Sequence, residues 1–134
     1  MKTKIITLTI VFFVIVAFAQ SQTRQSNTVQ QKLVSENTIY QLFPTQNFWT
    51  FIKLDTRNGK MWQVHFTVSD DGLQGEFILN ILPLVTKDKE VNGRFTLYPT
   101  ENIYNFLLLD KIDGKVYQVQ WSMESKNRGV IPIE

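Results

Sequence analysis

The sequence predicts an all-β protein in which two tandem copies of a three- to four-stranded antiparallel meander form a pseudo-two-fold sandwich or a small barrel. Three observations predict this class: a 30-residue segment occurs twice, short runs are rich in β-branched and aromatic residues, and turn signals separate the runs. Placing residues 40–69 over residues 95–124 requires no gap and gives eleven identities. Two blades cannot close a ring, so a propeller is excluded.

Each copy is expected to contain three strands followed by a fourth. The first strand of each copy ends at a Pro-Thr-x-Asn turn, and an Asn-Gly-Lys or Asp-Gly-Lys hairpin joins the second strand to the third. The fourth strands are interrupted near Pro83 and Pro132, whose missing N–H favours an edge position. The expected strands are residues 38–43, 48–55, 60–68 and 75–84 in the first copy and residues 93–98, 103–110, 115–123 and 129–134 in the second.

The hairpin turn determines which side chains share a face. Gly59 and Gly114 are expected to have positive φ, in a type I turn completed by a G1 bulge. The three-residue loop of such a turn places Leu54 opposite Trp62 and makes one face almost entirely apolar. The predicted core face of the first copy therefore carries Phe48, Thr50, Ile52, Leu54, Trp62, Val64, Phe66 and Val68, and the second copy repeats it 55 positions later.

This register leaves a second face with aromatic and amide side chains. One interpretation is that its aromatic rings pack beneath a neighbouring strand or the other copy, because most aromatic residues are largely buried. The other is an exposed surface that binds sugar rings or a protein partner. This face holds Trp49, Phe51, Lys53, Gln63, His65, Tyr104, Phe106, Leu108, Gln118 and Gln120, and the candidate ligand-binding residues are Trp49, Phe51, His65, Tyr104, Gln118 and Gln120.

The N-terminus has the features of a secretory signal peptide at residues 1–19. Lys2 and Lys4 precede an apolar run that is short for a membrane span, and Ala17-Phe18-Ala19 forms a small-x-small cleavage site. We therefore expect a periplasmic or secreted protein with no membrane attachment after cleavage. An uncleaved N-terminal anchor is the alternative.

The rest of the chain is expected to comprise a leader and one domain. Residues 20–37 are rich in Gln and poor in apolar side chains, which predicts a flexible polar leader. Residues 38–134 are predicted to be a single duplicated β domain, with repeat one at 38–84 and repeat two at 93–134.

Composition limits the classes of partner. The chain has 14 Lys and Arg against 12 Asp and Glu, and loss of the two signal-peptide lysines balances the charges. A balanced chain gives no electrostatic reason to expect nucleic acid or an anionic membrane as a partner. With no cysteine, stability must come from burial, for which the 13% aromatic content is sufficient.

The reactive side chains argue against catalysis. His65 is the only histidine and there is no cysteine, so common zinc sites and Cys–His nucleophiles are not expected, nor is any cofactor. A Ser-His-Asp site would have to combine His65 with Ser69 or Ser122, without a Gly-rich oxyanion loop nearby. Asp55 and Asp110 recur at equivalent hairpin positions, where a glycosidase-type carboxylate pair is one hypothesis and turn formation beside Gly is the better one.

The repeated phrases FPTQNFWTFIKLDTRNGKMWQVHF and YPTENIYNFLLLDKIDGKVYQVQW carry a family resemblance. In its Pro-Thr-x-Asn, Leu-Asp and Gly-Lys-x-x-Gln-Val elements, the chain resembles small, uncharacterised exported β-repeat proteins of Bacteroides-type bacteria over roughly residues 38–134. The resemblance implies export and a duplicated β unit, and it carries no activity.

Taken together, these features predict an exported, non-enzymatic binding or interaction module with an unknown protein or glycan partner. Two alternatives remain at this point. One is a glycan-binding accessory protein that uses the aromatic and amide face, and the other is a hydrolase that uses Asp55 or Asp110.

Overall fold

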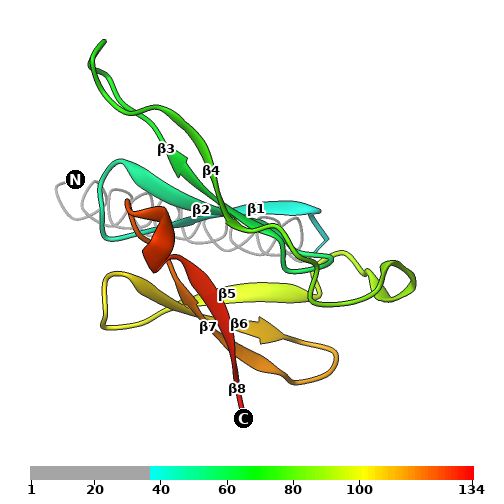
Figure 1. The fold of residues 1–134 in the computed structure, drawn as a ribbon. Helices are drawn as coiled ribbons and strands as arrows, with labels where there is room; N and C mark the ends of the chain where they lie inside the picture. Colours follow the sequence, from blue (N-terminus) through cyan, green and yellow to red (C-terminus); the bar gives the residue numbers. More distant parts are fainter. Residues whose placement is uncertain (1–36) are drawn as a thin grey trace, which may run out of the picture. The chain divides into compact units, whose positions relative to one another are not determined.

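The computed structural model of the protein describes residues 37–134, which form two four-stranded antiparallel sheets, one from each repeat (Figure 1). The predicted signal peptide, and the predicted leader up to residue 36, lie outside the described residues. From residue 37 onward the chain contains no helix with the length and hydropathy needed to cross a bilayer.

Each sheet is a meander in which strands consecutive in sequence are neighbours, in the orders β1-β2-β3-β4 and β5-β6-β7-β8. Pro132 lies in the edge strand β8, as its missing N–H predicts. The strands are β1 (Tyr40–Pro44), β2 (Thr50–Asp55), β3 (Met61–His65), β4 (Gly75–Asn80), β5 (Phe95–Pro99), β6 (Asn105–Asp110), β7 (Val116–Gln120) and β8 (Gly129–Ile133), with short 3₁₀ helices η1 (Lys87–Lys89) and η2 (Ser125–Asn127).

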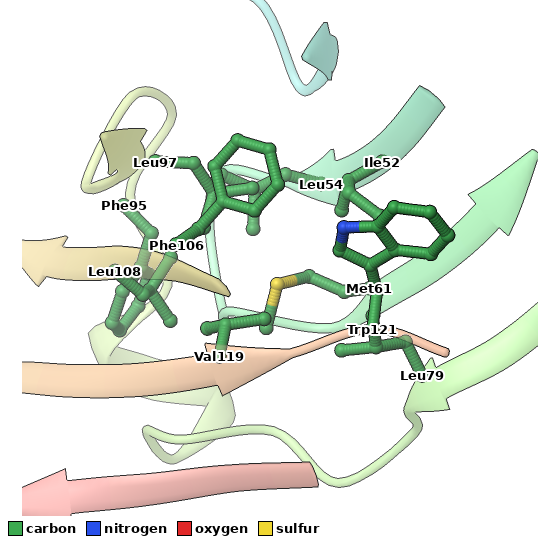
Figure 2. Close-up of a cluster of buried hydrophobic side chains, with 10 residues drawn as sticks. All are labelled: Ile52, Leu54, Met61, Leu79, Phe95, Leu97, Phe106, Leu108, Val119 and Trp121. Carbon is green, nitrogen blue, oxygen red and sulfur yellow. The ribbon is translucent and has the colours of Figure 1, made fainter. Parts of the chain in front are cut away.

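The two sheets pack face to face around one hydrophobic core, to which both contribute (Figure 2). This arrangement confirms the predicted all-β class and the sandwich of two tandem meanders. The buried core residues are Ile52, Leu54, Met61 and Leu79 from the first sheet and Phe95, Leu97, Phe106, Leu108, Val119 and Trp121 from the second sheet and its continuation.

The β2–β3 and β6–β7 hairpins each close with a glycine of positive φ, as predicted. Gly59 has a φ of 78° and Gly114 a φ of 70°. The N–H of Gly59 donates to the carbonyl of Asp55 at 3.0 Å, and Gly114 donates to Asp110 in the same way at 2.8 Å. Four residues therefore separate Asp55 from its partner Lys60, one more than the predicted loop contains.

The longer loop makes the predicted face assignment wrong in one strand of each repeat, because a shift of one residue turns a strand over. Leu54 lies opposite Met61 instead of Trp62. In the first repeat the inner face of β3 therefore carries Met61, Gln63 and His65 in place of Trp62, Val64 and Phe66. In the second repeat β6 turns Phe106, Leu108 and Asp110 inward in place of Asn105, Leu107 and Leu109.

As a result, the two repeats bury opposite faces. Ile52 is fully buried, whereas its equivalent 55 positions later, Leu107, is 37% exposed. Leu108 is fully buried, whereas its equivalent, Lys53, lies half-buried on the outer face of the first sheet. A two-fold axis would bring the same face of each repeat into the core. The repeats instead meet head to tail, through two different faces.

Candidate functional site

Two surface hollows occupy equivalent places in the two repeats, each between the turn before the second strand and the end of the third. We name them the Tyr104 hollow, of about 390 Å³, and the Trp49 hollow, of about 270 Å³. The Tyr104 hollow is lined by Asn102, Tyr104, Asn105, Gln120, Trp121, Ser122, Met123, Glu124 and Asn127. The Trp49 hollow is lined by Asn47, Trp49, Thr50, His65, Phe66, Thr67, Gly72, Leu73 and Met123.

The Pro-Thr-x-Asn turn builds the rim of each hollow. In the second repeat Thr100 Oγ1 donates to the carbonyl of Asn105 at 3.0 Å, and the side-chain oxygen of Asn102 accepts the N–H of Tyr104 at 3.0 Å. The first repeat has the same bonds at the positions 55 residues earlier. This turn holds one aromatic ring at each rim, and these rings, of Trp49 and Tyr104, are 44% and 48% exposed.

The Tyr104 ring lies on a fixed aromatic support. Its centroid is 5.3 Å from that of Trp121, which is almost fully buried. The indole Nε1–H of Trp121 donates to the carbonyl of Ile103 at 2.9 Å, which fixes the orientation of the indole. The hollow therefore presents a half-exposed phenol ring that the core holds in place.

Amide and carboxylate groups surround this ring. Gln120 Nε2 donates to the carbonyl of Asn127 at 2.9 Å, and the Asn127 side chain donates to Glu124 at 3.3 Å. The side-chain nitrogen of Asn105 is buried and has no hydrogen-bond partner within residues 37–134. A buried amide without a partner is uncommon in folded proteins and destabilises the fold.

The Trp49 hollow differs because its polar groups are already paired. Trp49 packs edge-on against Phe66, with centroids 5.2 Å apart. Thr50, the equivalent of Asn105, has its hydroxyl 3.0 Å from Nδ1 of His65. Thr50 in the first repeat therefore has a hydrogen-bond partner, whereas the equivalent Asn105 nitrogen in the second repeat has none among the described residues.

His65 belongs to a buried polar network that connects the two sheets. Gln63 Oε1 accepts the N–H of Ser122 at 2.9 Å, so its amide NH₂ donates to His65 Nε2 at 3.1 Å. Nδ1 of His65 then carries the proton and donates to Thr50. Burial lowers the pKa of His65, and the Arg128 cation lowers it further, so the ring is neutral at pH 7.

Asp55 and Asp110 hold the hairpin turns, as their positions beside Gly predict. Asp55 Oδ1 accepts the N–H of Arg57 at 3.0 Å, and Asp110 Oδ1 accepts the N–H of Ile112 at the same distance. Arg94 forms two further hydrogen bonds to Asp110, at 2.9 and 2.8 Å. Burial alone would raise both carboxyl pKa values, but these hydrogen bonds and the arginine charges outweigh it and hold both pKa values below their usual range.

The six predicted site residues do not share one face. Tyr104 and Gln120 lie together at the Tyr104 hollow, while Trp49 and the buried His65 lie at the other hollow. Phe51 is on the outer face of the first sheet, and Gln118 is exposed on the outer face of the second. Four further residues that line the Tyr104 hollow, Asn105, Trp121, Ser122 and Asn127, were not predicted as binding residues. Three of them are the repeat equivalents of Thr50, Phe66 and Thr67 at the Trp49 hollow.

Within residues 37–134, no three His, Asp or Glu side chains are grouped so that they could hold a metal ion. Comparisons of the chain with protein-family models, curated proteins and solved structures find no match. The function must therefore be argued from the geometry of the hollows.

Proposed function

We propose that the protein is an exported binding module without catalytic chemistry, and that its Tyr104 hollow holds a neutral, hydroxyl-rich ligand such as one sugar unit of a glycan. The observation that carries this proposal is the half-exposed Tyr104 ring, supported by Trp121 and surrounded by amide side chains. An aromatic ring offers an apolar surface to the C–H face of a sugar, and amides bind its hydroxyl groups. Export is supported by the signal-peptide features of residues 1–19.

The unpaired amide favours the second repeat over the first as the ligand site. Asn105 lines the Tyr104 hollow, and its nitrogen is covered by neighbouring atoms. A ligand oxygen that reached this nitrogen would give it a hydrogen-bond acceptor. The gain would offset the desolvation cost that the free protein carries. Thr50 offers no such gain at the Trp49 hollow, because it already pairs with His65.

The experiment is a titration of the protein, purified from its native host, with a panel of soluble oligosaccharides. Tyr104→Ala should weaken binding roughly tenfold or more and lower the stability by only about 1 kcal/mol, because half of the ring is exposed. Trp49→Ala is the matched control at the other hollow and should leave the affinity unchanged.

Three results would contradict the proposal. One is a wild-type protein that binds no oligosaccharide. The others are a Tyr104→Ala variant that binds as well as the wild type, and one that loses binding only because it unfolds. Cleavage of an oligosaccharide that Asp110→Asn abolishes would support the hydrolase alternative in its place.

A further inference from the structure

The internal contact between the repeats leaves a matching pair of surfaces on the outside of the molecule. The inner face of the first sheet binds the inner face of the second, and these two faces are not equivalent in the repeat. The outer face of each repeat therefore corresponds in sequence to the inner face of the other repeat. Contacts of this head-to-tail kind do not close within one molecule.

The outer face of the second sheet repeats the inner face of the first. Leu107 and Leu109 stand where the first repeat has Ile52 and Leu54, and Gln118 stands where it has Gln63. Gln63 is the residue that accepts the N–H of Ser122 across the internal contact. Gln118 is exposed and so presents the same amide to solvent.

The outer face of the first sheet likewise repeats the inner face of the second. Leu42 stands where the second repeat has Leu97, Phe51 where it has Phe106, and Val64 where it has Val119. All three equivalents are buried in the core, whereas Leu42 is 56% exposed. Exposed apolar residues gathered on one face of a sheet are typical of a surface that meets a protein partner.

From this correspondence we propose that copies of the chain associate head to tail. The outer face of the first sheet in one molecule binds the outer face of the second sheet in the next, in the geometry that already joins the two repeats. The second outer face also carries Asn105 and Gln120 of the Tyr104 hollow, so the association and ligand binding use neighbouring parts of one face. The association is open-ended because each added molecule presents a new free face.

One residue limits the strength of this contact. Lys53 stands on the first sheet where the second repeat has the fully buried Leu108. Its ammonium group pairs with Glu76 and lies 4.8 Å from the centroid of the Trp62 ring. A charge near the centre of an exposed sheet face weakens association without covering the apolar residues around it. Association should therefore be reversible and depend on concentration.

Sedimentation velocity tests the proposal on the protein as purified from its native host. The mean mass should rise with protein concentration and pass beyond that of a dimer. Leu42→Glu blocks the first outer face and Leu107→Glu blocks the second, so each variant alone should remain monomeric. An equimolar mixture of the two variants should form a dimer and nothing larger, because only one complementary pair of faces remains.

Lys53→Leu supplies the opposite change. It restores the leucine of the equivalent position and should tighten association roughly tenfold or more. Circular dichroism of each variant checks that the fold is retained, and Ile131→Glu replaces Leu107→Glu if that variant does not fold, since Ile131 is 60% exposed on the same face.

Two results would overturn the proposal. One is a wild-type chain that is monomeric at every concentration. The other is a Leu107→Glu variant that still dimerises alone, because the first outer face would then bind its own copy.

Discussion

The two repeats have the same turns and strand order, yet they bury opposite faces. Asp55 and Asp110 accept the same turn hydrogen bonds, and Gly59 and Gly114 have the same positive φ. Equivalent side chains on the adjoining strands nevertheless differ in burial, since Ile52 is buried and its equivalent Leu107 is exposed. Local sequence therefore determines the hairpin, whereas the contact between hairpins determines which of its faces becomes the core.

The largest expected difference between the repeats concerns their hairpin carboxylates. Arg94 and Asp110 are both almost fully buried, so Arg94→Met would leave a buried charge unpaired and should destabilise the fold by about 3 to 5 kcal/mol. Asp55 pairs with Arg57, which is 31% exposed, so Arg57→Met should have a clearly smaller effect. Urea denaturation of both variants measures the difference, and equal losses of stability would contradict it.

A second pair of variants tests the inversion of faces directly. Trp121 is 1% exposed, and Trp121→Ala should cost about 3 to 5 kcal/mol of unfolding free energy through the cavity that it creates. Phe66 occupies the equivalent position and is 39% exposed, so Phe66→Ala should cost about 1 kcal/mol. Chemical denaturation of the two variants side by side distinguishes them. Similar costs would mean that both repeats bury the same face.

The two hairpin glycines, Gly59 and Gly114, should differ less in the stability lost on replacement by Ala. Replacement by Ala forces positive φ on a residue with a Cβ, which costs of order 1 to 3 kcal/mol. A Cβ at Gly59 would lie 2.7 Å from Leu84 Cδ1, whereas a Cβ at Gly114 would meet nothing within 4 Å. Gly59→Ala should therefore lie at the upper end of this range and Gly114→Ala at the lower end, as measured by thermal unfolding. A larger loss at Gly114 would contradict the geometry.

The sequence predicted the strand order and the positions of the hairpin turns because the repeat shows them twice, although it predicted a loop one residue too short. The Asn-Gly and Asp-Gly signals correctly placed Gly59 and Gly114 at positive φ. The register was missed because the prediction chose the strand pairing that makes one face almost entirely apolar, and that pairing placed Gln63 and His65 on the other face. Both are tolerated in the core because their polar atoms bond to each other, to Thr50 and to the N–H of Ser122.

The candidate site was predicted less well for the same reason. The assignment of a second face singled out Trp49 and Tyr104 as candidate binding residues, and both are about half exposed. Asn105 was assigned to the core face, and its position at a hollow depends on the register of β6 and on the opposite face being buried. Neither can be deduced from one hairpin considered alone.

The smallest expected effect is a pH dependence that only the first repeat should show. Burial lowers the pKa of His65 below its usual 6.5, with a further contribution from the Arg128 cation. As pH falls below 6.5, the unfolded chain binds a proton at His65 before the folded chain does, so stability falls with pH in this window. Asp55 and Asp110 lose their stabilising charge only as pH falls below 3.8, which separates the two effects.

The variant that tests this assignment is His65→Gln, because the second repeat has Gln120 at the equivalent position. Its amide cannot take up a proton in this range, so its melting temperature should be constant between about pH 5 and 7, while that of the wild type falls toward pH 5. Differential scanning calorimetry across this range measures both profiles. Below pH 4 the two profiles should run parallel, because the carboxylates of both proteins titrate there. If the two proteins instead respond identically between pH 5 and 7, His65 is not the group that links stability to pH.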